Sequence, residues 1–335
     1  MVVSVKDVAA RAGVSVGTVS NVMNWPEKVS AETVLRVQAS IAELGFVRND
    51  AARQLRAGSS RAIGMVVLDI GNPFFSDLVR GAEGKAAESG YSIILGNSDE
   101  KVERESTYLD LFEQQRMHGV LISPFGDIEP RLERLRARGT PAVLVDRTSR
   151  AGHFSSVSVD DIAGGMLAAE HLITRGRRRI AYVCGPHQIR QVLDRLDGVR
   201  RVVMRHDGVA LEVMTRAALS VQEGRKAGEE IVRRRPSDRP DAVFAANDLM
   251  AVGVLQALSM LGGIKVPDDI ALIGYDDIAF ARAAVVPLSS VRQPSALIGG
   301  TAVEILLEEA ADVALERRHI VFQPELVVRE STGLG

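Results

Sequence analysis

The sequence has few of the features that mark secreted or membrane proteins. Cys184 is its single cysteine, so no internal disulfide can form and a secreted disulfide scaffold is excluded. No apolar run approaches the roughly 18 residues that a membrane-spanning helix needs. The N-terminus lacks the basic region and long apolar run of a secretory signal. We therefore expect a cytoplasmic protein that does not contact a membrane.

Aromatic residues are also scarce, at 4%, and neither sign of charge prevails. The chain of 335 residues has 41 Lys and Arg against 43 Asp and Glu, so its bulk charge does not predict polyanion binding. The first 60 residues differ, because they hold seven basic and five acidic side chains. Four arginines and one acid fall within residues 48–61. This small basic head on an acidic body favours a polyanion contact at the head.

What the sequence does contain is typical of a soluble globular protein, with 46% hydrophobic and 25% charged residues. The first 45 residues predict three short helices. Ser4, Ser15 and Ser30 are placed to cap the helix starts, and Gly13 and Gly45 suit the left-handed position after a helix.

The first two of these helices have the spacing of a helix-turn-helix. Ala9 is small where two helices cross closely, Gly13 suits the tight turn, and Val19 packs the second helix onto the first. This places small and polar side chains on the outer face of the second helix, where base edges and phosphates are read. The alternative is a three-helix cap without a ligand. The residues predicted to contact DNA here are Ser15, Val16, Gly17, Thr18, Ser20 and Asn21.

After residue 61, short apolar runs alternate with amphipathic helical stretches, and the rhythm repeats in the second half. Fully apolar strands between helices predict parallel strands covered on both faces, hence doubly wound α/β halves. Strands near 288–292 and 320–328 come late in the chain. They could complete sheets begun earlier, so we expect more than one crossing between the halves.

The most specific motifs extend through the whole chain: VKDVAARAGVSVGTVSNVMN (5–24), AELGFVRNDAARQLRAG (42–58), GNPFF (71–75), SVDD (158–161), AANDLMAVG (245–253), VPDDIALIGYDD (266–277), QP (293–294) and PELVVRESTG (324–333). Together they resemble the lactose-repressor (LacI-type) family of bacterial transcription regulators. The resemblance implies a helix-turn-helix head, a hinge helix, and a core similar to periplasmic sugar-binding proteins. It further implies three crossovers between two lobes that close on a small molecule, and a homodimer on a near-palindromic operator.

We therefore predict a small all-α head and an α/β core of two doubly wound parallel-sheet lobes. The expected boundaries are 1–47 for the DNA-binding head, 48–60 for the hinge helix and linker, and 61–335 for the effector-binding and dimerisation core, with an N-lobe of about 61–159 and 291–320 and a C-lobe of about 160–290 and 321–335.

The resemblance also assigns roles in the hinge. Leu55 matches the leucine that wedges into the minor groove at the operator centre, and Arg53 and Arg56 suit the phosphate contacts beside it. The alternative is a solvated linker leucine. Arg48 departs from the proline found in many relatives, and it either loosens the start of the hinge helix or adds a phosphate contact.

The effector pocket is expected at the carboxyl ends of the strands in both lobes. Carboxylates, an amide and arginine side chains converging there form a hydrogen-bonding set for a polyol, and two aromatic rings could cover a ligand face. Locally, Asn247 and Asp276 could simply cap the next turn, and Arg195, which matches the family's effector-binding arginine, could be solvated. The predicted effector-binding residues are Phe74, Phe75, Asp146, Arg147, Asp161, Arg195, Asn247 and Asp276.

Two positions depart from the family's pocket. Leu219 and Ser295 stand where several relatives have aromatic side chains. Without a stacking platform, a flat purine is a poorer match than a small sugar-like effector.

No nucleotide-cradling glycine motif follows a strand, and no nucleophile elbow or metal-ligand spacing of the six histidines is present. We therefore expect no cofactor, no metal and no enzymatic activity. The leading interpretation is a sequence-specific DNA-binding repressor controlled by a sugar-like effector. The alternative is a sugar-binding or sugar-processing α/β protein whose head mediates protein contacts. Whether the effector releases or strengthens DNA binding stays open.

Overall fold

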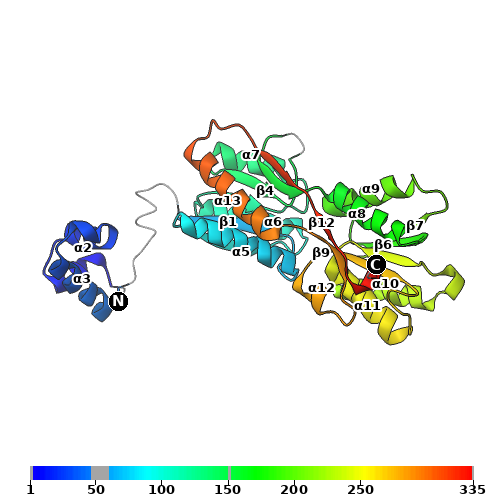
Figure 1. Ribbon diagram of the computed structural model, residues 1–335. Helices are drawn as coiled ribbons and strands as arrows, with labels where there is room; N and C mark the ends of the chain where they lie inside the picture. The colour runs from blue at the N-terminus through cyan, green and yellow to red at the C-terminus, as the bar shows by residue number, and fades with distance from the viewer. Residues whose placement is uncertain (1–2, 47–59, 150–151, 334–335) are drawn as a thin grey trace. The chain divides into compact units, whose positions relative to one another are not determined.

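The computed structural model describes residues 3–46, 60–149 and 152–333 (Figure 1). It divides into two compact units, Met1–Ser59 and Ser60–Gly335, which we call the head and the core. Within the described residues no helix has the length and apolar character needed to cross a membrane. The predicted hinge residues Arg53, Leu55 and Arg56 lie outside the described residues.

The head contains the predicted helical bundle. One fully buried valine from each helix, Val8, Val19 and Val37, forms the centre of its small core. This burial is what orients the remaining faces of the helices toward solvent. The elements are α1 (Val5–Ala12), α2 (Val16–Asn24), the 3₁₀ turn η1 (Pro26–Lys28) and α3 (Ala31–Leu44).

Local capping explains where these helices begin and end. The Ser15 hydroxyl accepts a hydrogen bond from the backbone N–H three residues on, at 3.0 Å. The Ser4 backbone N–H and hydroxyl both bond to the carboxylate three residues on, at 2.8 and 2.7 Å. Gly13 and Gly45 take the predicted left-handed conformation, with φ of 66° and 62°. The prediction for Ser30 is wrong in its chemistry, because its hydroxyl bonds to a threonine hydroxyl instead of capping a backbone N–H.

The first lobe of the core, which we call the N-lobe, is a parallel six-stranded sheet in the order β11-β5-β4-β3-β1-β2. Its central strands are buried along their whole length, as expected for a sheet covered on both faces. Helix α13 packs along α5 on one face (Figure 1). The elements are β1 (Ala62–Val67), α5 (Pro73–Glu88), β2 (Ser92–Asn97), α6 (Val102–Gln114), β3 (Val120–Ile122), α7 (Glu129–Ala137), β4 (Ala142–Val145), β5 (Ser156–Val159), α13 (Ser295–Ala311) and β11 (His319–Phe322).

The second lobe, the C-lobe, has a sheet in the order β12-β10-β9-β8-β6-β7, which is parallel except for the antiparallel pair β10–β12. The two doubly wound lobes confirm the predicted fold class. The elements are α8 (Asp161–Thr174), β6 (Arg179–Cys184), α9 (Arg190–Val203), β7 (Ala210–Thr215), α10 (Val221–Arg233), η2 (Pro236–Asp238), β8 (Ala242–Ala245), α11 (Asp248–Leu261), β9 (Ala271–Asp276), α12 (Ala279–Ala283), β10 (Ser289–Arg292), β12 (Glu325–Val327) and η3 (Glu330–Thr332).

The chain crosses between the lobes three times, between β5 and α8, between β10 and α13, and between β11 and β12. The expected lobe boundaries at 290/291 and 320/321 are wrong, because they cut through β10 and β11. β10 stays paired with β9 through Arg292, and β11 stays paired with β5 through Phe322. The end of each strand depends on its pairing with another strand, β9 for β10 and the distant β5 for β11, so the local pattern does not reveal where either strand ends.

Candidate functional site

The core contains a cavity lined by residues of both lobes. It lies at the carboxyl ends of the parallel strands, where a doubly wound sheet is expected to bind ligands. Six of the eight predicted effector residues line it, namely Phe74, Phe75, Asp146, Arg195, Asn247 and Asp276.

The two aromatic side chains are held at the start of α5. Asn72 caps this helix, since its Oδ1 accepts a hydrogen bond from the Phe74 backbone N–H at 3.1 Å. The Phe74 and Phe75 rings meet edge to face, with centroids 5.0 Å apart. Both are buried in the core and line the cavity, so they supply an apolar wall.

Two aspartates reach the cavity from the ends of strands. Asp276 is the last residue of β9, and Asp146 directly follows β4. Both have positive φ, 101° and 57°, a region that side chains other than glycine rarely adopt. Such backbone strain is concentrated at functional sites, where the surrounding structure holds it in place.

Direct hydrogen bonds across the cavity join the two lobes. Asn72 Nδ2 of the N-lobe donates to Asp276 Oδ2 of the C-lobe at 3.0 Å. The C-lobe also donates to the N-lobe. Gln191 Nε2 of α9 donates to Asp146 Oδ2 at 2.8 Å and to the Asp146 backbone carbonyl oxygen at 2.6 Å. A ligand that bonds to Asp146 Oδ2 or Asp276 Oδ2 competes with contacts that hold the lobes against each other.

Arg195 is almost completely buried, at 4% exposure, so the alternative of a solvated arginine is wrong. Its Nε donates to Asp161 Oδ1 and its Nη1 to the Ala246 carbonyl oxygen, both at 2.7 Å. The guanidinium also lies over the Tyr275 ring, 3.6 Å from its centroid. Asp161 does not itself line the cavity, and its place is to fix this arginine.

The remaining predicted residues behave differently from one another. Asn247 lines the cavity, but its Oδ1 caps α11 at 2.9 Å and its Nδ2 donates to the Leu219 carbonyl oxygen at 3.2 Å, which confirms the local capping role. For Asp276 the alternative of capping the next turn is wrong, because its carboxylate accepts from the side-chain amides of Asn72 and Gln293.

Arg147 was predicted to bind the effector but does not line the cavity; its Nη1 donates to the Gly126 carbonyl oxygen at 2.8 Å. Leu219 lines the cavity and Ser295 does not.

Sequence reasoning missed three amides in the site. Asn72 and Gln293 lie in motifs that were identified, GNPFF and QP, although neither was assigned a role. Gln293 Nε2 donates to Asp276 Oδ1 at 2.7 Å. Gln191 belongs to no motif, and nothing local distinguishes it from a surface glutamine at the start of a helix.

Two acceptor atoms in the cavity wall have no hydrogen-bond partner among the described residues. They are Asp146 Oδ1 and Gln293 Oε1, both buried. Buried polar atoms without a partner are rare because they are costly, so each needs an explanation. Hydroxyl groups of a bound ligand would donate to both.

The cavity is acidic. Asp69, Glu100, Asp146 and Asp276 line it together with a single guanidinium, that of Arg195. Burial raises the pKa of Asp146 well above its usual range, and the nearby Asp161 carboxylate raises it further. Burial also raises the pKa values of Asp161 and Asp276, although Arg195 opposes both shifts.

Glu100 also lines the cavity, and its pKa is raised as well. Burial, and then the charges of Asp69 and Asp99, raise its pKa to about 7. These shifts have a common main cause, because burial disfavours the charged form of each carboxyl group, and neighbouring carboxylates add to it at Asp146 and Glu100. An anionic ligand would add to this repulsion.

In the head, the predicted DNA-contact residues lie on one side of α2. Val16, Gly17 and Asn21 are exposed, whereas Val19 and Val22 of the same helix are buried. The remaining predicted residues, Ser15, Thr18 and Ser20, are exposed or half-buried.

Two family models match the chain. They are "Bacterial regulatory proteins, lacI family" over residues 4–49 and "Periplasmic binding protein-like domain" over residues 169–332. The ribose operon repressor of Escherichia coli (strain K12) is 34% identical over 339 residues, which covers 98% of this chain and 99% of that protein. The HTH-type transcriptional repressor PurR of Aliivibrio fischeri (strain MJ11) is 33% identical and covers 98% of each chain.

Solved structures agree with these matches. The lac repressor dimer bound to operator and the anti-inducer ONPF has a TM-score of 0.85 and 28% identity over 100% of both chains. A LacI-family regulator from Enterococcus faecium with bound ribose has a TM-score of 0.74 and 28% identity, and covers 81% of this chain and 98% of that chain. The predicted resemblance is confirmed, and this protein belongs to the lacI family of bacterial regulatory proteins.

Proposed function

We propose that this protein is a transcriptional repressor that binds a near-palindromic DNA operator as a homodimer, under the control of a small uncharged sugar-like effector in the interlobe cavity. The main observation behind the proposal is the cavity, which is lined by several carboxylates and contains, among the described residues, two hydrogen-bond acceptors without a partner. The same chain has a helix-turn-helix in its head. The protein would act in the cytoplasm, by binding and not by catalysis.

Relatives support this combination. Proteins that match nearly the whole chain carry the names ribose operon repressor and transcriptional repressor PurR. A dimer bound to operator DNA and a regulator with bound ribose share its fold.

The head would read DNA through α2. Asn21 can form a bidentate hydrogen bond to adenine, Val16 can contact a thymine methyl, and Gly17 lets the backbone come close to the groove. Hydroxyl groups and free N–H groups at the helix start would hold phosphates. The proposed DNA-binding residues are Ser15, Val16, Gly17, Thr18, Ser20 and Asn21, with Arg53, Leu55 and Arg56 beyond the described residues.

The effector would be a neutral polyol. Hydroxyl groups can donate to Asp146 Oδ1 and Gln293 Oε1, and Phe74 and Phe75 can cover an apolar face of the ligand. Leu219 offers no aromatic ring on which a purine could stack. The phosphate group of a phosphorylated sugar would be repelled by the carboxylates that line the cavity. Arg195 is the one guanidinium among the described lining residues, and it is already paired with Asp161, so no further cation among them offsets this repulsion.

Control would arise as a shift between conformations of the core. A ligand that takes the Asp146 and Asp276 carboxylates competes with the Gln191 and Asn72 amides, which now join the lobes. Binding therefore changes which interlobe contacts are made, and a ligand can shift an equilibrium only by such differential contacts.

The effector class can be tested by thermal unfolding of the full chain with D-ribose and with D-ribose 5-phosphate. A ligand present at about 100 times its Kd stabilises the folded state by about 2.7 kcal/mol. We expect D-ribose, or another neutral sugar from a panel, to raise the Tm and the phosphate ester of the same sugar to leave it unchanged. Stabilisation by the phosphate ester alone would contradict the proposal.

The DNA partner can be tested by selecting binding sites from random duplexes. We expect a site with two-fold symmetry. The bound protein should sediment as a dimer. A selected pool with no common sequence would contradict the role of the head.

A further inference from the structure

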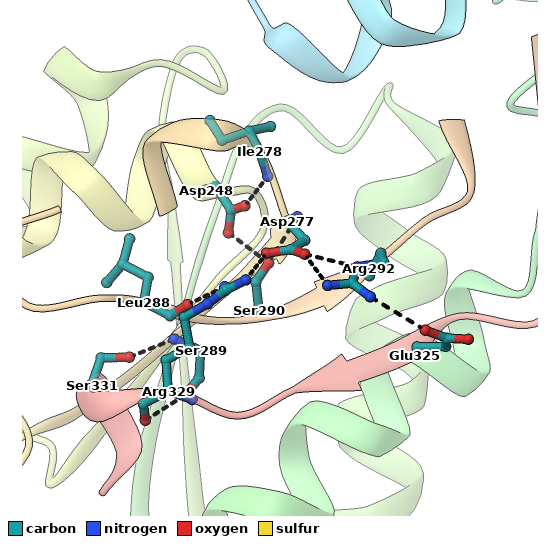
Figure 2. Close-up of polar contacts among 10 residues, drawn as sticks. All are labelled: Asp248, Asp277, Ile278, Leu288, Ser289, Ser290, Arg292, Glu325, Arg329 and Ser331. Carbon is teal, nitrogen blue, oxygen red and sulfur yellow. Dashed lines mark hydrogen bonds and ion pairs between the residues drawn. The ribbon is translucent and has the colours of Figure 1, made fainter. Parts of the chain in front are cut away.

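A second polar cluster lies directly beside the cavity. Asp277 follows Asp276, but its carboxylate contacts two arginines, Arg292 and Arg329 (Figure 2). The Asn72 and Gln293 amides bond to Asp276 instead. The Asp277 side chain is only 5% exposed and its φ is 55°. Neighbouring aspartates of one turn therefore serve two separate networks.

The two arginines lie on strands that lead into or out of different crossovers, one at the end of β10 and the other just after β12. Arg292 ends β10, immediately before the chain crosses to the N-lobe, and its Nε and Nη2 both lie 2.8 Å from Asp277 Oδ2. Arg329 follows β12, after the chain has returned, and its Nη2 lies 2.6 Å from Asp277 Oδ1. Arg292 Nη1 is also 3.6 Å from Glu325 Oε2, at the first residue of β12 (Figure 2).

The cavity and the crossovers are thus joined by two adjacent residue pairs. Gln293, which lines the cavity, donates to Asp276. Its neighbour Arg292 pairs with Asp277. A ligand that displaces Gln293 from the Asp276 carboxylate would move the backbone at Gln293. This movement would pull on the adjacent Arg292, which is held by Asp277.

The backbone of this turn is fixed independently of the Asp277 carboxylate. Ser290 Oγ accepts from the Asp277 backbone N–H at 3.0 Å and donates to Asp248 Oδ1 at 2.7 Å. Asp248 Oδ2 accepts from the Ile278 N–H at 2.9 Å (Figure 2). Loss of the Asp277 charge therefore leaves these bonds in place and removes only the link to the arginines.

We infer that Asp277 is a positioning residue that couples the contacts made in the cavity to the two C-terminal crossovers between the lobes. The inference rests on the proposed function, since it describes how occupancy of that cavity is transmitted. Its physical basis is that one buried carboxylate binds the last residue before the second crossover and a residue just beyond β12, which follows the third crossover. A shift of either strand therefore changes the contacts of this carboxylate.

The test is a double-mutant cycle on the full chain without any ligand. Asn72→Ala removes an interlobe bond in the cavity and the cap of α5, and Asp277→Asn removes the charge that holds Arg292 and Arg329. The loss of the cap is common to both backgrounds, so it cancels in the cycle. Amide hydrogen exchange at residues 293–295 and 323–327 reports on the crossovers. In the wild-type protein we expect Asn72→Ala to raise the amide exchange rate at these residues by roughly tenfold. In the Asp277→Asn variant the same substitution should raise it by less than about twofold.

Two further variants keep the test decisive. Arg292→Gln removes one arm of the cluster at a side chain that is 47% exposed, so it should fold, and it should also abolish the effect of Asn72→Ala. Asp197→Asn breaks a surface ion pair with Arg201 at 2.7 Å and should leave the effect as in wild type. The inference is overturned if Asn72→Ala acts equally in the Asp277→Asn background, or if it leaves wild-type exchange at the crossovers unchanged.

Addition of D-ribose to the same samples separates this inference from the proposed function. If the sugar changes neither Tm nor exchange in wild type, the proposed effector class fails while the mutant cycle still decides the role of Asp277.

Discussion

On α2 of the head, Val16, Gly17 and Asn21, which are proposed to meet DNA, are exposed, whereas the side chains of the core that line the effector cavity are buried between the lobes. Val16 and Asn21 face solvent, but Arg195 and Asp276 are almost inaccessible. The surface residues are free to form contacts with a polyanion. The buried residues already have partners, so the ligand must compete with internal contacts. The two regions should therefore respond differently to salt, to truncation and to pH.

The largest contrast is expected in salt dependence. A dimer with several phosphate contacts releases counterions and should lose roughly 10³-fold or more in operator affinity between about 50 and 200 mM salt, although the protein is net acidic. Binding of a neutral effector inside the core should hardly change over the same range. Fluorescence anisotropy and calorimetry measure the two affinities. A flat salt dependence of DNA binding would remove the contrast.

Next in size is the effect of removing the buried arginine. Arg195→Ala leaves the Asp161 carboxylate without its cation and should lower the free energy of unfolding of the core by about 3–5 kcal/mol. Arg190→Ala on the same helix is the matched control, because Arg190 forms an exposed pair with Asp194 that is worth about 0–1 kcal/mol. Urea unfolding measures both. Equal effects would show that burial of the pair is energetically unimportant.

On the surface of the head, truncation should change specificity and leave stability nearly intact. Asn21→Ala removes a bidentate contact to a base and should cost about 1–3 kcal/mol of discrimination at one position of each half-site. Gln38→Ala, at an exposed position of α3, is the control and should leave the preferred site unchanged. Selection from random duplexes reads both outcomes. An unchanged motif for Asn21→Ala would mean that α2 docks differently.

A smaller effect is expected from the pH dependence of the acidic cavity. The folded-state pKa of Glu100, about 7, is higher than its ordinary value of 4.5, so the folded protein holds this proton more tightly than the unfolded chain. Its contribution to stability is present below about pH 4.5 and is lost as the pH rises through 7. Relative to Glu100→Gln, wild type should lose about 1 kcal/mol across this range, after allowance for solvent screening. Parallel stability curves for the two proteins would contradict the predicted pKa.

The contrast between the regions also explains what could be predicted from the sequence. The head is held together by contacts within about 40 residues, so cap residues and helical spacing reveal it. The strands of the core are recognisable from their apolar runs. Their ends are not, because they depend on partners such as Phe322 with Val159. For the same reason the expected second and third crossings both fall two residues before the strands end at Arg292 and Phe322.

Within the cavity, the sequence identified charged groups better than the amides that engage them. Asp146, Arg195 and Asp276 end or follow strands, and their chemistry is visible in the motifs. The bond from Asn72 to Asp276 joins residues 204 positions apart, and the Gln191 bond joins residues 45 positions apart. No local pattern encodes such contacts, and a neutral amide has no charge to indicate that it requires a partner.

We claim that a neutral sugar in the core cavity controls DNA binding by the exposed head. The most direct measurement is the operator affinity of the full chain during titration with neutral sugars, beginning with D-ribose, and with D-ribose 5-phosphate. A neutral sugar should change that affinity by about 5- to 150-fold, the usual range of coupling between two sites, and the phosphate ester should not. In Asp276→Asn the sugar should have no effect. An operator affinity that no neutral sugar changes in wild type would contradict the claim.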